Sequence, residues 1–262
     1  ALESIALEMG HKLMRMSYSS IIRESEDFGA ALTDAEGQQM CECRMSTPLQ
    51  SGPIPGYIRN VLKVLAERDD PVRPGDVIMH NDPYGGASHG PDVAFCVPVF
   101  QGEALIGWSA TTAHHLDIGA LSPGSCGIVD AVDTYAEGLQ FKAIKVFDQG
   151  KRNDAVWHIL RANIRATDLV VGDMEAQIEA ARIGAARLLG LVDRYRLDST
   201  MAAFHDLMDY SERLMRDAIR ALPDGEYSAS TMLDGYLDDP NPARRELPLV
   251  VTLKVQGDDL TV

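Results

Sequence analysis

The sequence has few positive charges: 24 Lys and Arg residues stand against 39 Asp and Glu residues, which gives a net charge of −15 at pH 7. Such a surface repels nucleic-acid phosphates and anionic lipid headgroups. Long hydrophobic runs are also missing, since no apolar stretch approaches the roughly 20 residues of a membrane span. The N-terminal residues lack the basic flank and apolar core of a signal peptide. We therefore expect a cytoplasmic protein that binds neither nucleic acid nor membranes.

Cysteines and the common catalytic motifs are equally scarce. The four cysteines are Cys41, Cys43, Cys96 and Cys126, and the single residue between Cys41 and Cys43 is the wrong spacing for a C-x2-C zinc site or redox pair. We expect all four to be free thiols. The sequence contains no G-x-S-x-G elbow, no P-loop and no G-x-G-x-x-G after a strand, so it supports neither a serine hydrolase nor a nucleotide-binding site. Any ATP chemistry must lie on another chain.

The pattern of apolar residues predicts an α+β protein. Helical spacing runs over 2–23 and 57–68, and again over 153–165, 168–194 and 199–222. Stretches rich in β-branched and aromatic residues at 76–79, 93–100 and 104–112 predict strands. We expect a mixed or antiparallel sheet that carries a β-hairpin and packs with long C-terminal helices.

Three regions follow from this order of elements. Residues 1–150 are expected to form an α+β domain that holds the site, and residues 151–222 a helical region. Residues 223–262 are interpreted as the start of a β-rich region, because a second strand begins at Leu260 and stops. We expect the chain to be cut within that region, and a native C-terminal strand is the alternative.

The hairpin at 93–112 carries the candidate site at its open end. A loop rich in glycine and proline at 81–92 holds His89 and Asp92, and the second strand returns to His114 and His115. Paired residues in an antiparallel hairpin have a constant sum of numbers. A turn at 101–102 pairs position 89 with 114, and a three-residue turn pairs it with 115. Either register brings the two motifs together.

Two imidazoles and a carboxylate suit Zn, Mn or Fe(II). Because adjacent strand residues point to opposite faces, only one of His114 and His115 should coordinate, and the other would contact substrate or be structural. Asp117 either orients a ligand imidazole or caps a turn. Asp27 is an acidic residue in an otherwise apolar stretch. Gly85 and Gly86 either let the backbone approach a ligand or form a tight turn.

Several motifs in order make the sequence resemble the hydantoinase B family. This family includes B subunits or domains of ATP-dependent hydantoinases and 5-oxoprolinases, and the equivalent subunits of acetone and acetophenone carboxylases. The resemblance runs nearly end to end. The motifs that carry it are IRESEDF (22–28), TPLQSGPIPG (47–56), NDPYGGASHGPD (81–92), HHLDIG (114–119), SPGS (122–125), EGL (137–139), RANIR (161–165) and GDMEAQ (172–177).

The resemblance implies a divalent metal held by an early aspartate and by the His-x-x-Asp and His-His motifs. These positions are Asp27, His89, Asp92 and His114 in this sequence. We assign His115 and Asp117 as the candidate catalytic residues.

The sequence departs from the family pattern at a few positions. The loop after Tyr84 is one residue short, Gly29 replaces a common Ser, and Gln50 stands where many members have His. These departures bear on the identity of the substrate more than on the metal. Family members are also about twice this length or more.

The resemblance further implies a reaction shared between two subunits. A HyuA-like ATPase subunit uses ATP and Mg to phosphorylate the substrate oxygen, and this subunit completes hydrolysis of a cyclic amide of the hydantoin, oxoproline or lactam type at its Mn, Zn or Fe ion. The alternative is carboxylation of a ketone at the same site. The third possibility is a non-catalytic scaffold in which the metal only stabilises the hairpin. A closed set of four protein ligands would favour it.

Overall fold

The computed structural model describes residues 1–125, 131–236 and 238–262. The chain forms two compact units, Ala1–Met201 and Ala202–Val262. Cys41, Cys43 and Cys96 are free, as expected, whereas Cys126 lies outside the described residues. Among those residues, no helix is both long and apolar enough to cross a membrane.

The first unit is built on an antiparallel sheet, which is seven-stranded within the described residues and has the order β2-β1-β5-β4-β3-β6-β7. The longest strands, β4 and β5, lie at its centre and are buried on both faces over most of their length. That double burial is why their sequences are near-continuous apolar runs. The strands are β1 (Phe28–Thr33), β2 (Gln39–Glu42), β3 (Val77–His80), β4 (Asp92–Gln101), β5 (Ala104–His114), β6 (Ile144–Asp148) and β7 (Lys151–Arg152).

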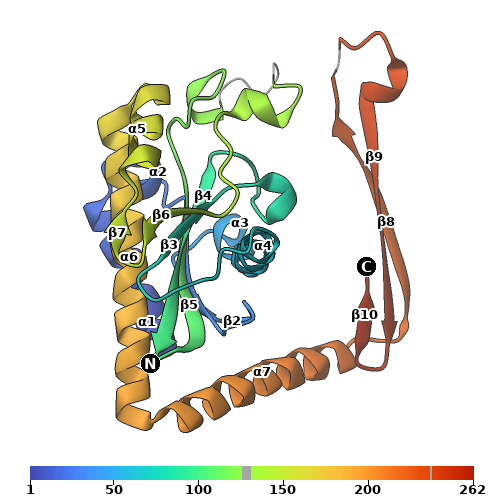
Figure 1. Cartoon of the computed structure of the whole chain (residues 1–262). Helices are drawn as coiled ribbons and strands as arrows, with labels where there is room; N and C mark the ends of the chain where they lie inside the picture. Colours follow the sequence, from blue (N-terminus) through green and yellow to red (C-terminus); the bar gives the residue numbers. More distant parts are fainter. Residues whose placement is uncertain (126–130, 237) are drawn as a thin grey trace. The chain divides into compact units, whose positions relative to one another are not determined.

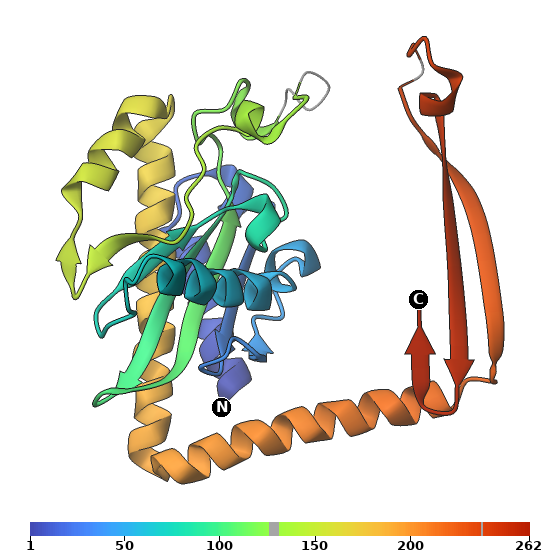
Figure 2. The same cartoon turned by 45° about the vertical axis from the view of Figure 1, so that its right-hand side comes forward.

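Helices cover both faces of this sheet (Figures 1 and 2). The long α6 packs against β4 and β5 on one face, beside α1, and α4 lies on the other face. The expected α+β class with an antiparallel sheet and long C-terminal helices is confirmed. The helices are α1 (Leu2–Met16), α2 (Ser20–Arg23), α3 (Pro48–Ser51), α4 (Ile54–Glu67), α5 (Asp154–Asn163) and α6 (Thr167–Tyr195), with short 3-10 turns at η1 (Pro83–Gly85), η2 (Pro123–Ser125) and η3 (Thr134–Glu137).

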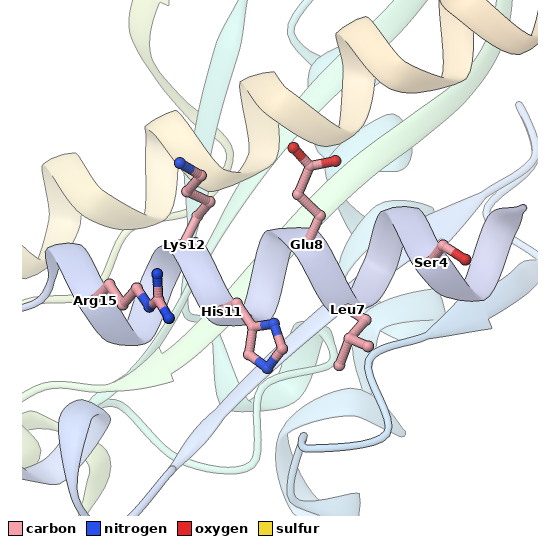
Figure 3. Close-up of a pocket in the computed structure, with 6 residues that line it drawn as sticks. All are labelled: Ser4, Leu7, Glu8, His11, Lys12 and Arg15. Carbon is pink, nitrogen blue, oxygen red and sulfur yellow. The ribbon is translucent and has the colours of Figure 1, made fainter.

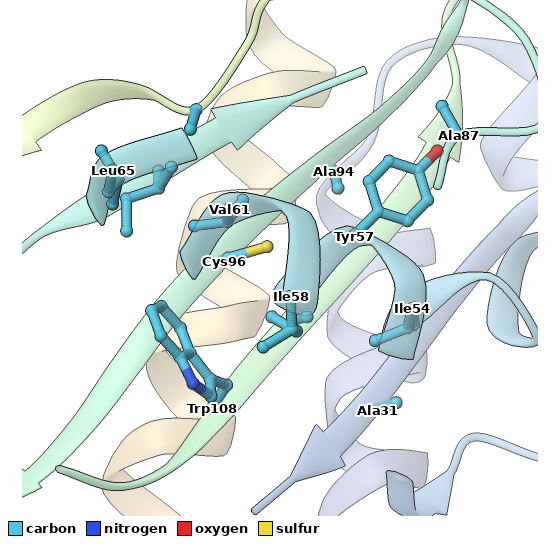
Figure 4. Packing of buried hydrophobic residues seen from close by; sticks show 13 residues of the cluster. Ala31, Ile54, Tyr57, Ile58, Val61, Leu65, Ala87, Ala94, Cys96 and Trp108 are labelled. Atoms are coloured by element: carbon cyan, nitrogen blue, oxygen red, sulfur yellow. The ribbon is translucent and has the colours of Figure 1, made fainter. Parts of the chain in front are cut away.

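The core between α4 and the sheet fixes which residues of the hairpin face which layer. Even-numbered residues of β4 and β5, such as Cys96 and Trp108, pack against Ile58 and Val61 of α4 (Figure 4). Odd-numbered residues such as Thr111 therefore face α6, where the Thr111 hydroxyl donates to the carbonyl of Gln177 at 3.2 Å.

The register of the hairpin differs from both expected pairings. Asp92, not position 89, lies directly across from His114. The turn lies one residue later than predicted, between Gln101 and Ala104, because Gly102 adopts the positive φ of 62° that this turn needs. A β-bulge between Val99 and Phe100 shifts the register once more.

The N-terminal helix predicted over 2–23 is interrupted. α1 ends at Met16 and α2 begins at Ser20. The carboxylate Oδ1 of Asp173, on α6, accepts hydrogen bonds from the backbone N–H groups of Tyr18 and Ser19 at 2.6 and 3.2 Å. A tertiary contact thus supplies partners that a continuous helix would have found within itself.

The second unit contains most of α7 (Leu197–Arg220) and a three-stranded antiparallel sheet of order β10-β9-β8. Its strands are β8 (Gly225–Asp234), β9 (Glu246–Gln256) and β10 (Asp259–Thr261), with a turn η4 (Pro242–Arg244). The division between the two units falls after Met201, and α6 belongs to the first unit because it packs against β4 and β5.

Candidate metal centre

Three side-chain donors meet at the open end of the β4–β5 hairpin. His89 Nε2 lies 3.1 Å from His114 Nδ1, and Asp92 Oδ1 lies 3.2 Å from each of these nitrogens. Among the described residues, these are the one group of three His, Cys, Asp or Glu side chains with donor atoms close enough to share a metal ion. His114 and Asp92 meet because they are cross-strand partners on the same face, and His89 reaches them from the loop before β4.

The spacing of these donors fits a first-row divalent cation. A cation about 2.1 Å from each of two donors at right angles separates those donors by about 3.0 Å, and a tetrahedral angle separates them by about 3.4 Å. The observed 3.1–3.2 Å falls between these values. Two imidazole nitrogens with one carboxylate suit Zn, Mn or Fe(II).

Asp92 is a buried carboxylate that keeps its charge. The residue is 1% exposed, and its second oxygen, Oδ2, is buried without a hydrogen-bond partner among the described residues. Burial raises the pKa of Asp92, but hydrogen bonds from His114 and His89 outweigh burial, so the net pKa lies well below the ordinary value. The hydrogen bond to Asp92 likewise raises the pKa of His89 above its usual value. The carboxylate therefore stays ionised and suited to bind a cation.

Glu137 holds the other side of the His89 ring. Its Oε1 lies 3.3 Å from His89 Nδ1, and its Oε2 accepts from the backbone N–H of Gly90 at 3.0 Å. A carboxylate on the outer nitrogen fixes the tautomer that leaves Nε2 free to bind metal. The sequence pattern suggested Asp117 as either an orienting residue or a cap and missed Glu137, although the EGL motif at 137–139 was a signal.

Two further side chains hold Asp92 itself. The amide Nε2 of Gln50, on α3, donates to Asp92 Oδ1 at 2.8 Å. The hydroxyl of Tyr57, on α4, donates to the backbone carbonyl of Asp92 at 2.9 Å. Burial raises the pKa of Tyr57 well above its ordinary value, so the phenol keeps its proton.

The two adjacent histidines do point to opposite faces. His114 joins the cluster on the α3 and α4 side, and His115 is fully buried against α6, where its Nε2 lies 2.8 Å from Gln177 Oε1. Burial lowers the pKa of His115, which keeps the ring neutral.

Asp117 organises a loop in this structure. Its Oδ1 accepts from the backbone N–H of Gly119 at 3.0 Å and of Ala120 at 3.3 Å, and its Oδ2 accepts from the backbone N–H of Arg165 at 2.8 Å. The Arg165 guanidinium adds a fourth bond to Oδ1 at 3.3 Å. These contacts are those of a residue that caps a turn, which was one of the two roles suggested for Asp117 from the sequence.

Asp27 lies beside the cluster without joining it. Its backbone carbonyl accepts from the His114 N–H at 3.2 Å, which places it across from His114 at the start of β1. Its carboxylate Oδ1 instead accepts from the Thr47 hydroxyl at 3.4 Å. The backbone thus brings Asp27 next to one ligand, and its own coordination stays a prediction.

The two loop glycines serve packing against α4. A Cβ at Gly86, whose φ is 113°, would lie 2.6 Å from the backbone of Gly56 and Tyr57. A Cβ at Gly85 would collide with the Asn60 side chain. The structure favours the tight-turn alternative, with the close approach made to a helix.

A separate hollow runs along α1, lined by Ser4, Leu7, Glu8, His11, Lys12 and Arg15 (Figure 3). All of its lining residues come from one helix, and none belongs to the metal cluster. Glu8 is already paired with Arg187 at 2.9 Å. This hollow therefore has no part in the site described above.

The fold and the cluster together define a helix-flanked antiparallel sheet whose central hairpin gathers a two-histidine, one-carboxylate donor set. The Hydantoinase B/oxoprolinase family model matches residues 1–262, so the chain belongs to this family, as its motifs predicted.

Among its relatives, the putative B subunit of a D-/L-hydantoinase from Pseudomonas sp. (strain NS671) is 66% identical over 262 residues, which is 100% of this chain and 44% of that protein. The beta subunit of the caprolactamase of Pseudomonas jessenii is 33% identical over 266 residues and is also covered to 44%. The crystal structure of the ATP-dependent caprolactamase from that organism matches with a TM-score of 0.86 at 32% identity, over 99% of this chain and 43% of that one. The chain thus spans less than half the length of these relatives.

Proposed function

We propose that this chain is the metal-binding part of a subunit that completes the ATP-dependent hydrolysis of a cyclic amide of the hydantoin, oxoproline or lactam type. A HyuA-like partner subunit would use ATP and Mg to activate the amide oxygen. The observation that carries the proposal is the meeting of His89, Asp92 and His114 at metal-ligand spacing in a member of this family. The similarity to subunits of a hydantoinase and of a caprolactamase supports hydrolysis as the reaction.

The chain's own residues have distinct parts in this proposal. His89, Asp92 and His114 would hold a divalent cation, Mn, Zn or Fe(II), with Asp27 as the further ligand implied by the family. When bound, such a cation supplies Lewis-acid polarisation and lowers the pKa of water. Glu137 keeps His89 in the tautomer whose Nε2 faces the cluster. Without a cation, hydrogen bonds from both imidazoles keep Asp92 ionised, and a bound cation would take the place of the two donated protons.

The candidate catalytic residues act at a distance from the cluster's centre. His115 faces α6 and Asp117 binds the loop at 119–120 and Arg165. We propose that both support the hairpin end on which the ligands stand.

The coordination of the bound cation would distinguish catalysis from a structural role. A structural zinc site closes with four protein ligands, whereas a catalytic site keeps a position for water or substrate. The cluster has three donors within the described residues, and Asp27 would be the fourth, so a water-filled further position on the cation would assign catalysis and a closed tetrahedron a structural role.

Metal binding by the His89→Ala variant tests the proposal. The complete subunit, purified with its partner, is assayed for bound metal and for ATP-dependent consumption of hydantoins, lactams and ketones with bicarbonate. We expect His89→Ala to lose both metal and activity, while His11→Ala, an exposed histidine of α1, keeps both. Full activity in a metal-free His89→Ala protein would reject the site. Consumption of ketone and bicarbonate in place of amides would assign carboxylation.

A further inference from the structure

We propose that two buried glutamines, Gln50 and Gln177, are positioning residues that set the spacing of the metal ligands. They act on the feet of the hairpin, defined as Asp92 and Val93 on β4 and His114 and His115 on β5. The inference deepens the proposed function, because it assumes that a cation binds at this cluster.

Gln177 bridges the two feet from the α6 side. Its Nε2 donates to the carbonyl of Val93 at 3.0 Å, and its Oε1 lies 2.8 Å from His115 Nε2. Its own backbone carbonyl accepts from the Thr111 hydroxyl at 3.2 Å. The residue is 0% exposed. One side chain therefore ties together the residue after one ligand and the residue after another.

The chemistry of these contacts allows a single arrangement. A backbone carbonyl only accepts, so the NH₂ of Gln177 must face Val93 and its oxygen must face His115. His115 then carries its proton on Nε2, and its buried Nδ1 has no hydrogen-bond partner in the part of the chain that the structure describes. Gln177 has one amide orientation and His115 one tautomer that satisfy these contacts. The two hydrogen bonds of Gln177 therefore fix the distance between Val93 and His115 on the α6 side of the sheet.

Gln50 holds the same feet from the opposite face. Its Nε2 donates to Asp92 Oδ1 at 2.8 Å, and its backbone carbonyl accepts from the Thr112 hydroxyl at 2.9 Å. Gln50 is 1% exposed. Since Thr111 and Thr112 are consecutive residues of β5, their hydroxyls leave opposite faces of the strand. β5 therefore donates a hydrogen bond on each face to the backbone carbonyl of a glutamine. The side chain of each glutamine donates to a residue of β4.

The two glutamines therefore set different parts of the cluster's geometry: the orientation of the Asp92 carboxylate and the separation of β4 and β5. Gln50 selects the rotation of the Asp92 carboxylate, because its donor engages the oxygen that also meets both imidazoles. Gln177 controls how far the strands can separate beside Asp92 and His114. Loss of a group that orients a metal ligand typically weakens metal binding about 10–100-fold.

Cobalt binding by the complete subunit tests this inference. The variants Gln50→Met and Gln177→Met keep side-chain length and lose the amide, and Co²⁺ is titrated while its visible absorption bands report the coordination geometry. We expect affinity to fall about 10–100-fold in each variant and the bands of the bound ion to shift. Thr33→Val is the matched control, because it removes a buried hydroxyl bonded to the Asp34 carbonyl at 2.9 Å, where β1 pairs with Trp108 far from the feet. It should bind Co²⁺ like the wild type.

The outcomes separate the two proposals. Wild-type protein that binds no Co²⁺, or His89→Ala protein that binds it equally well, overturns the proposed function. Wild-type binding that is lost in His89→Ala but keeps its affinity and spectrum in both methionine variants overturns the positioning role alone, even if those variants are less stable. If Gln177→Met fails to fold, Gln177→Glu keeps the shape and the acceptor for His115 but sets an oxygen against the Val93 carbonyl, and the same loss of affinity is expected.

Discussion

Replacing Asp117 by Asn tests whether this buried carboxylate is structural or catalytic. The residue is 2% exposed and accepts four hydrogen bonds, three at Oδ1 and one at Oδ2. Asparagine has one acceptor oxygen, which can keep the three donors at Oδ1. Its NH₂ group must then face the backbone N–H of Arg165, which lies 2.8 Å from Oδ2 in the native protein.

The size of the effect follows from these contacts. A hydrogen bond to a charged group contributes about 1.5–3 kcal/mol, and an unsatisfied buried donor costs about 1–3 kcal/mol. The lost ion pair adds little, because the Arg165 side chain is 53% exposed and solvent screens it. We expect a loss of about 2–4 kcal/mol in the free energy of unfolding.

Thermal and urea unfolding of the complete subunit measure this loss, and Co²⁺ titration measures the centre separately. The matched control is Asp34→Asn, whose bonds to the Glu36 and Gln38 N–H groups use one oxygen and lie in an exposed turn, so it should change stability by less than about 1 kcal/mol. An Asp117→Asn protein with wild-type stability and no activity would refute the structural role and indicate that Asp117 takes part in catalysis.

Three other substitutions probe the supports of the site. Gly86→Ala should cost about 2–4 kcal/mol, measured by urea unfolding, because a Cβ at φ 113° meets the Gly56 backbone at 2.6 Å; wild-type stability would contradict this packing. Lys145→Met should cost about 3 kcal/mol at pH 7, since it removes the cation 3.1 Å from buried Asp76. Burial lowers the pKa of Lys145, but its hydrogen bonds to two aspartates outweigh burial and raise the net pKa. The stability that Lys145 contributes is therefore complete below about pH 10.4 and is lost as pH rises through the folded-state pKa. A stability difference between wild type and Lys145→Met that grows as pH rises further would contradict this prediction. Glu137→Gln should weaken Co²⁺ binding about 10-fold with stability nearly unchanged, and equal affinity would show that this carboxylate does not orient the ligand.

The elements of the fold were predictable where local sequence decides them. The apolar runs of β4 and β5 and the spacing along α6 gave their positions to within a few residues. The break between α1 and α2 was not predictable, because the carboxylate that satisfies Tyr18 and Ser19 comes from Asp173, more than 150 residues away. Helical periodicity contains no record of such a distant partner.

The candidate site divides in the same way. The hairpin pattern predicted that His89 and Asp92 meet the His114–His115 pair at its open end, although the later turn and the bulge at Val99 changed the register. Glu137 and Gln177 come from distant segments and show no spacing that links them to the hairpin. The ligands are therefore encoded locally, whereas the groups that aim them are set by the tertiary fold.

The central place of β4 and β5 in the sheet has a consequence for metal exchange. Each of these strands has a neighbour on both sides, β3 beside one and β1 beside the other. Neither strand can move away from the cluster to release an ion without breaking the backbone hydrogen bonds to its outer neighbour. Of the three donors in the described cluster, only His89 lies outside the strands, so a cation should enter and leave through movement of the loop that bears His89.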